Sequence, residues 1–172
     1  MRIELHFGDI TDYEADCIVN AARPSLKGGG GVDGAIHRKA GNELLEFCKM
    51  LGSCSVGEAK LSPAFNLVSK NIIHTVGPRL LFNNEKEKED LRNCYLSCLE
   101  IANNNKFNTI VFPNISTGAY GFPKELASAI AFKIVIEYLE KNEYPMKVVF
   151  CCFDIENLEL YISLFRNELN KV

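Results

Sequence analysis

The sequence predicts an α/β domain built on a largely parallel central sheet. Short apolar runs that suit strands alternate along the chain with longer stretches whose apolar residues recur at helical spacing. The chain has 172 residues, which suits one domain and leaves no room for two ordinary ones. Apolar residues make up 47% and charged residues 24%, the composition of a soluble globular protein. We therefore expect a single domain across residues 1–172.

Six short segments have the character of strands. They are residues 2–7, 17–19, 59–61, 72–76, 109–112 and 148–153. The first alternates between apolar and polar side chains, so we expect a half-buried strand at or near a sheet edge. The second is short and apolar and ends at Asn20, and Pro113 stops the fifth.

Four segments carry apolar side chains at helical spacing. They are residues 33–51, 85–103, 123–141 and 158–169. Gly52 closes the first, which we expect to be one continuous helix, and Pro123 suits the first turn of the third. The third is apolar nearly all round, which predicts a well-buried helix.

Composition excludes several classes of protein. A net charge of −3 argues against a broad nucleic-acid surface, and no apolar stretch is long enough for a membrane span. The first ten residues lack the apolar core of a signal peptide. The seven cysteines are odd in number and form no C-x-x-C pair, so we expect neither a disulfide framework nor a zinc ribbon. Reduced thiols favour the cytoplasm.

Four polar or glycine-containing segments follow predicted strands. They are residues 8–11, 20–33, 115–121 and 153–154. In α/β folds, ligands bind outside the carboxyl ends of the strands. The sequence therefore predicts one binding site built from these four segments.

The run of four glycines from Gly28 to Gly31 predicts an anion-binding loop. Each ordered glycine costs about 0.5–1 kcal/mol of extra entropy, which a flexible surface linker would avoid. The run leads into a helix, where backbone N–H groups bind anions. It lacks the G-x-x-x-x-G-K-[ST] pattern of a P-loop. It also begins eight residues after Asn20 and has Cys54 where a dinucleotide-binding fold needs an acid.

The segment from Ile115 to Gly121 is predicted to be a second phosphate loop. Its small residues open the backbone to a ligand, and Tyr120 offers a ring to cover a sugar or base. The alternative is an ordinary strand-to-helix loop that needs glycine turns. Because neither the run Gly28–Gly31 nor the segment Ile115–Gly121 contains a lysine, we expect backbone N–H groups to hold the phosphate. This mode of binding also fits the acidic character of the protein.

Two residues point to a nucleobase. A carboxylate at Asp9 accepts hydrogen bonds only, so it suits an adenine amine and would repel a guanine oxygen. Phe153 ends a strand and offers a ring for stacking. The alternatives are a turn aspartate for Asp9 and a core position for Phe153.

Asp33 and His37 are four residues apart, so they share one face of the predicted helix. Together they can orient or deprotonate a water molecule. Capping of the helix alone also explains Asp33, and a packed or exposed histidine explains His37.

Together these motifs resemble the macro domain, and the glycine run resembles the MacroD-type subgroup, which includes bacterial O-acetyl-ADP-ribose deacetylases. The matching segments are residues 8–11, 18–22, 28–37, 73–78, 115–121 and 152–157, so the resemblance covers essentially the whole chain. It implies a three-layer α/β/α sandwich with a mixed sheet of about six strands.

The resemblance also implies roles for individual residues. Those expected to bind substrate are Asp9, Ile10, Ala22, Arg23, Gly30, Gly31, Val32, Ser116, Thr117, Gly118, Ala119, Tyr120 and Phe153. Those tied to catalysis are Asn20, which would fix the distal ribose, Asp33, which would activate the water, and His37 in support. No cysteine–histidine cluster resembles the zinc-containing subgroup, so we expect neither a metal nor a cofactor.

One position departs from the family. Arg23 stands where the family commonly has Asn, and arginine offers donors only. Pro24 pushes Arg23 toward an extended conformation, which limits its reach. This departure puts rate and substrate preference in question more than ADP-ribose binding.

The resemblance implies a hydrolase that removes mono-ADP-ribose from acidic side chains and deacetylates O-acetyl-ADP-ribose. Its partners would be ADP-ribose, ADP-ribosylated proteins or O-acetyl-ADP-ribose, with no membrane and no nucleic acid. The alternative is a catalytically weak module that binds ADP-ribose. An RNA-binding regulator has less support, because the sequence shows no basic stripe.

Overall fold

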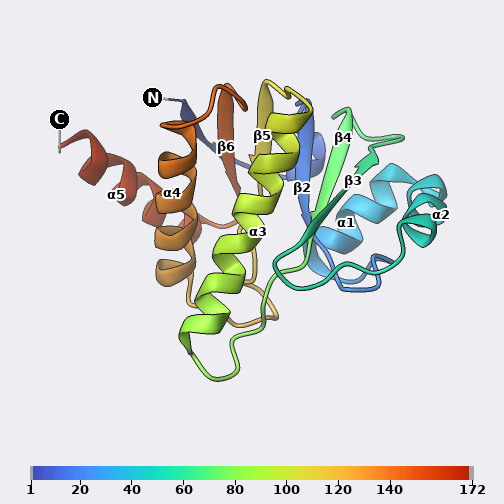
Figure 1. The fold of residues 1–172 in the computed structure, drawn as a ribbon, viewed down its shortest axis with the longest axis horizontal. Coiled ribbons are helices and arrows are strands. Elements are labelled where there is room, and N and C mark those ends of the chain that lie inside the picture. Colours follow the sequence, from blue (N-terminus) through green and yellow to red (C-terminus); the bar gives the residue numbers. More distant parts are fainter. Residues whose placement is uncertain (1, 171–172) are drawn as a thin grey trace.

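The computed structural model describes residues 2–170 and contains the predicted mixed sheet. Six strands lie in the order β1-β6-β5-β2-β4-β3. Their bounds are β1 Ile3–Phe7, β2 Cys17–Ala21, β3 Ala59–Pro63, β4 Asn71–Thr75, β5 Thr109–Phe112 and β6 Lys147–Cys152. All neighbouring pairs are parallel except β3 and β4. The carboxyl ends of five strands therefore share one edge of the sheet, and β1 is an outer strand as expected (Figure 1).

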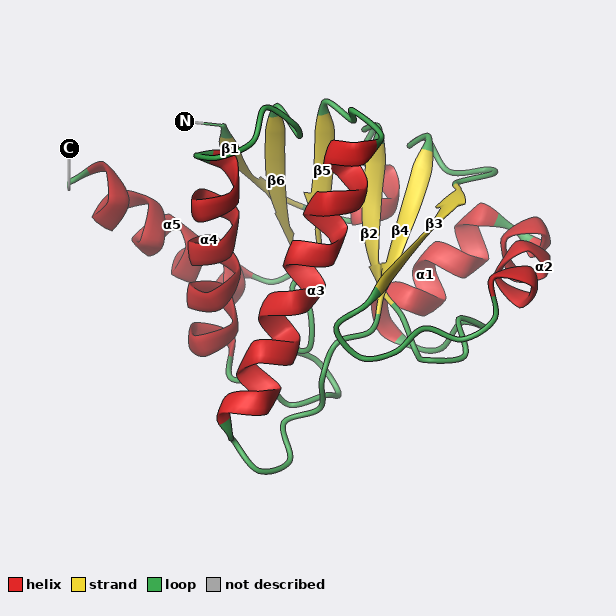
Figure 2. Cartoon of the chain, in the orientation of Figure 1, coloured by secondary structure: helices red, strands yellow, loops and turns green. Residues whose placement is uncertain are grey.

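Helices cover both faces of the sheet, which confirms the three-layer prediction (Figure 2). Their bounds are α1 Gly31–Ala40, α2 Asn42–Leu51, α3 Glu85–Asn104, α4 Lys124–Leu139 and α5 Ile155–Leu169. Helices α3, α4 and α5 pack on one face, and α1 and α2 pack on the other. Within residues 2–170, no helix is long and apolar enough to cross a membrane.

Each face of the sheet has its own apolar core. On the α3–α5 side, aromatic rings interlock, and the rings of Phe150 and Tyr161 stack 4.3 Å apart. On the α1–α2 side, aliphatic residues such as Ile18, Ile36 and Leu44 are completely buried. Burial of each such side chain stabilises the fold by about 1.5–3 kcal/mol, so the sheet gives the loops at its edge a rigid base.

The predicted helix over residues 33–51 is wrong in one respect, because it is two helices. Gly41 has φ of 91°, ends α1 and precedes α2. A side chain at this backbone conformation is strained, so glycine allows the break. The apolar stripe continues across the break, with Ala40 and Leu44 both buried, so the spacing alone predicted one helix.

Other boundaries moved by a few residues. Pro123 caps α4 rather than lying in its first turn, and α4 ends at Leu139, two residues early. The last helix, Ile155–Leu169, contains the whole predicted apolar stripe, and it begins where the Asp154 side chain accepts a hydrogen bond from the Asn157 N–H and caps it.

Candidate functional site

A cavity of about 610 Å³ lies at the carboxyl ends of the strands and is built from all four predicted segments. All the residues expected to bind substrate line it, and so does Asp33. The set is Asp9, Ile10, Ala22, Arg23, Gly30, Gly31, Val32, Asp33, Ser116, Thr117, Gly118, Ala119, Tyr120 and Phe153. Asn20 and His37 do not line it, but both contact the Asp33 carboxylate. The strand-end argument therefore located the cavity correctly.

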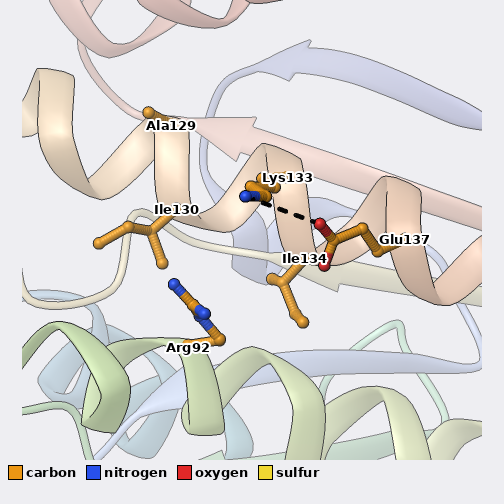
Figure 3. Close-up of a pocket in the computed structure, with 6 residues that line it drawn as sticks. All are labelled: Arg92, Ala129, Ile130, Lys133, Ile134 and Glu137. Atoms are coloured by element: carbon orange, nitrogen blue, oxygen red, sulfur yellow. Dashed lines mark ion pairs between the residues drawn. The ribbon is translucent and has the colours of Figure 1, made fainter.

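A smaller cavity of about 160 Å³ lies between α3 and α4 (Figure 3). Its apolar wall is formed by Ile130 and Ile134. Its charges are paired on their own helices, Lys133 with Glu137 at 3.8 Å and Arg92 with Glu89 at 3.7 Å. It is a groove between packed helices, remote from the strand ends.

At one end of the large cavity, Asp9 presents a carboxylate. Residue Thr11 donates to its Oδ1 from both the backbone N–H (2.9 Å) and the hydroxyl (2.7 Å). The Thr11 hydroxyl is the largest influence on the pKa of Asp9 and, with the other donors, holds it below its ordinary value despite partial burial. Asp9 is therefore an ionised acceptor at neutral pH, with Oδ2 directed to no partner among residues 2–170.

Phe153 lies at the same end because the first and last strands are neighbours. Strand β1 pairs with β6, and Phe7 lies opposite Cys152 in the register. The segments that follow, which contain Asp9 and Phe153, therefore leave the sheet side by side. Phe153 is 78% exposed, which excludes the core alternative and leaves its ring open to the cavity.

The glycine loop presents backbone to the middle of the cavity. Gly30 is the N-cap of α1, and Gly31 has φ of 58°. A Cβ atom at either position would meet nothing within 4 Å, so this surface faces open space. The N–H groups of the first turn of a helix lack partners within the helix, so they can donate to an anion here.

The second loop is tightly folded. The N–H of Phe122 donates to the Ser116 carbonyl at 2.9 Å, and Ser116 has φ of 65°. A Cβ atom at Gly77 would lie only 2.2 Å from the hydroxyl oxygen of Ser116, so position 77 requires a glycine. The Ser116 hydroxyl is buried without a partner in the described chain, on a residue that lines the cavity.

Asp33 is 3% exposed and lies in the first turn of α1, not at its cap, which is Gly30. Its Oδ1 accepts a hydrogen bond from Asn20 Nδ2 at 2.8 Å and lies 3.5 Å from His37 Nε2. Its Oδ2 is buried and has no partner within residues 2–170. Burial raises the pKa of Asp33, opposed by the Asn20 hydrogen bond and by the nearby His37 and Arg23. This is the environment of a carboxylate that can accept a proton.

Asn20 is completely buried and joins Asp33 to the sheet. Besides Asp33, its Nδ2 contacts Nδ1 of His74 at 3.1 Å, because Asn20 and His74 are opposite in the β2–β4 register. Since the two hydrogens of Nδ2 serve these two acceptors, His74 Nδ1 must carry no proton. Its Nε2 then donates to Ser62 Oγ at 2.8 Å.

His74 is therefore a neutral, oriented side chain. Burial lowers the pKa of His74 to about 3, with His37 as a second influence. No role for His74 or Ser62 followed from the sequence, although His74 lies in the matched segment 73–78. Their contacts join β2, β3 and β4, so sequence spacing carried no sign of them.

The cavity wall also includes residues that were not predicted, among them Arg38, Asn114 and Asn157. Asn157 Nδ2 donates to Asp154 Oδ2 at 2.8 Å, and its own oxygen is buried without a partner in the described residues. Its place four residues after Phe153, in the first turn of α5, was the signal that could have identified it.

Comparisons with known proteins agree with this geometry. The family model described as Macro domain matches residues 19–131. The O-acetyl-ADP-ribose deacetylase of Enterobacter sp. (strain 638) is 49% identical over 167 residues, covering 95% of this chain and 93% of that protein. The human ADP-ribose glycohydrolase MACROD2 is 45% identical over 172 residues, covering 99% of this chain and 40% of that longer protein.

Solved structures are similarly close. The Oceanobacillus iheyensis macrodomain with ADP has a TM-score of 0.93 at 39% identity, covering 99% of this chain and 93% of that one. The Trypanosoma brucei macrodomain in complex with ADP-ribose has a TM-score of 0.89 at 37% identity, covering 95% and 69%. By sequence and by fold, this chain belongs to the macro domain family.

Proposed function

We propose that the protein binds ADP-ribose and hydrolyses esters of its distal ribose. The substrates are proteins mono-ADP-ribosylated on acidic side chains and O-acetyl-ADP-ribose. The observation that carries this proposal is the buried Asp33 carboxylate at the cavity wall, held by Asn20 and with a raised pKa. The names of the bacterial and human relatives support the same reaction class.

The cavity suits a nucleoside diphosphate sugar. Asp9 would accept from the adenine amine, beside Ile10, while Phe153 stacks on the base. The N–H groups of the glycine loop and of the second loop would hold the diphosphate, and Tyr120 would cover the distal ribose. A preformed cavity of about 610 Å³ fits a ligand of this class.

Hydrolysis would use water directly. Asp33 would orient a water molecule and accept its proton as the oxygen attacks near the distal ribose. The ester C–O bond then breaks, and the proton taken up by Asp33 passes to the departing oxygen, so that the products are the free carboxylic acid and ADP-ribose and Asp33 is again ionised. General-base assistance of this kind contributes about 10²–10⁴-fold. No covalent intermediate is needed, and no step requires a metal.

Asn20 would act through Asp33 rather than by touching the ribose. The resemblance implied direct contact, but the Asn20 side chain is buried and absent from the cavity wall. We assign it, with His74 behind it, the role of fixing the Asp33 carboxylate in one orientation. His37, 3.5 Å from that carboxylate, would support the same orientation.

Incubation with a protein mono-ADP-ribosylated on glutamate, and separately with O-acetyl-ADP-ribose, tests the proposal. Wild type should release free ADP-ribose from both, with and without chelator. If wild type binds ADP-ribose but releases nothing, the protein is instead a binding module. The exposed Arg23 at the cavity wall, in place of the family Asn, favours that second function.

We also place the protein in the cytoplasm. All seven cysteines are free and buried, which suits a reducing compartment. Burial raises the pKa of Cys48 and Cys94 to about 11, so these thiols are unreactive at neutral pH.

A further inference from the structure

We propose that the polypeptide part of an ADP-ribosylated substrate docks on two exposed apolar residues, Leu81 and Phe82, beside the cavity. We call this pair the Leu81–Phe82 platform. Leu81 is 70% exposed and Phe82 is 79% exposed, and they are adjacent in the segment between β4 and α3. The inference rests on the proposed function, because it concerns what is attached to the distal ribose.

The strand order indicates the end of the cavity where a polypeptide emerges. Asp9 and Phe153 follow β1 and β6 at one side of the sheet. The second loop follows β5, and Asp33 lies in the segment after β2. A ligand with its base at Asp9 and its reacting ester near Asp33 therefore points toward β4. The segment that leaves the carboxyl end of β4 carries the platform.

The platform is joined directly to the cavity. The Leu80 N–H donates to the Tyr120 carbonyl at 2.9 Å. The Arg79 guanidinium carbon lies 4.9 Å from the centre of the Tyr120 ring, and Tyr120 lines the cavity. Figure 1 shows the segment before α3 lying beside the segment before α4, at the foot of both helices. An acyl group that leaves the cavity past Tyr120 would meet this segment first.

The platform is held in place although its side chains point to solvent. The buried Glu87 carboxylate accepts hydrogen bonds from the N–H groups of Leu81 (2.8 Å), Phe82 (3.0 Å) and Asn84 (3.1 Å). Asn84 reciprocates by accepting from the Glu87 N–H at 2.9 Å, which completes a capping box at the start of α3. A single exposed apolar residue is ordinary, but two neighbours on a fixed backbone form a preorganised contact surface.

The chemistry of the platform favours a polypeptide over a smaller ligand. Aromatic residues and arginine are enriched at protein interfaces, and Phe82 and the nearby Arg79 provide both beside the aliphatic Leu81. The acetyl group of O-acetyl-ADP-ribose has only two carbons and would end inside the cavity. The platform should therefore distinguish protein substrates from the small ester.

The test compares two substrates on two double variants. In Leu81→Ser with Phe82→Ser, kcat/KM for a protein mono-ADP-ribosylated on glutamate should fall roughly tenfold or more, mainly through KM, as for loss of a central contact. Turnover of O-acetyl-ADP-ribose should stay unchanged. The matched control, Met50→Ser with Val68→Ser, removes two other exposed apolar side chains that lie outside the cavity wall. It should leave both rates unchanged.

The platform is overturned, and the hydrolase function left intact, by either of two results in the platform variant. One is an equal fall in kcat/KM for both substrates, and the other is no fall in kcat/KM for the protein substrate. If wild type hydrolyses neither substrate, the proposed hydrolase function fails, and calorimetry decides the platform alone. The platform is supported if wild type binds the ADP-ribosylated protein more tightly than free ADP-ribose and the platform variant does not. Equal affinities overturn it.

Discussion

The two ends of the cavity are built by opposite strategies. At the Asp9 end, the interacting groups are on the surface: a carboxylate fixed by Thr11 and a ring that is 78% exposed. At the Asp33 end, the carboxylate is almost completely buried and depends on a chain of partners in the three strands β2, β4 and β3. The difference indicates that the first end provides affinity and the second provides the chemistry. Substitutions at the Asp9 end should therefore weaken binding, and substitutions at the Asp33 end should slow turnover.

The largest expected effect is at the buried end. Asp33→Ala should lower ester hydrolysis by about 10²–10⁴-fold, the usual contribution of a general base. ADP-ribose affinity should change by less than about tenfold, or ~1.4 kcal/mol, because backbone N–H groups hold the phosphates. Single-turnover rates and calorimetry on the same preparations measure the two effects.

Asp33→Asn is the matched control for that experiment. It keeps the size of the side chain and an oxygen that can accept the hydrogen bond from Asn20, but it cannot accept the proton of water. An equal loss of ester hydrolysis in Asp33→Ala and Asp33→Asn supports the role of Asp33 as the general base. Full activity of Asp33→Asn would mean that Asp33 is structural.

The next largest effect is at the exposed end. Asp9→Ala should weaken ADP-ribose binding by about 1–3 kcal/mol, the range for a hydrogen bond to a charged group. Turnover at saturating substrate should be preserved, because Asp9 is remote from the reacting ester. Wild type should also bind the guanine analogue more weakly, since a carboxylate repels the guanine oxygen. Equal affinity of wild type for the two nucleotides would refute the assignment of Asp9 to the base.

His74 tests whether the buried end is a connected unit. His74→Leu removes the acceptor that fixes the Asn20 amide, so kcat should fall roughly tenfold, the effect of a small misplacement of catalytic groups, with KM unchanged. His74→Asn places an oxygen near the position of Nδ1 and should restore most of that rate. Because the pKa of His74 is about 3, the histidine should add no pH dependence near neutrality. If the two variants are equally active, Asn20 does not need His74.

The smallest effect concerns Arg23. Protonated Asp33 cannot accept a proton, so hydrolysis should decline as pH falls through its raised pKa. The Arg23 charge lowers that pKa, so Arg23→Asn should move the acid limb of the kcat profile to higher pH. Binding should be retained, and turnover at high pH should be kept or raised. Arg38→Asn, which removes another cation from the cavity wall, should leave the limb in place. Loss of turnover at every pH in Arg23→Asn would give the arginine a catalytic role of its own.

The exposed end was predictable from sequence and the buried end only in part. The loops at the strand ends follow from the alternation of strands and helices, and the motifs around Asp9 and Gly28–Gly31 are local. Gly41 was missed because the apolar stripe is continuous across it. The contact between Asn20 and His74 spans 54 residues and depends on strand register, which no local pattern encodes.

The pairing of β1 with β6 has a consequence for how the molecule is made. The first strand can complete its place in the sheet only after residues 147–152 have been synthesised. Contacts so distant in sequence carry a large loop-closure entropy and form late in folding. During synthesis, the Asp33 end, formed from β2, α1 and β4, can therefore assemble before the Asp9 end exists. A nascent chain should acquire its affinity for a nucleotide only after residues 147–153 have been synthesised, so ligand capture would report that the sheet is complete.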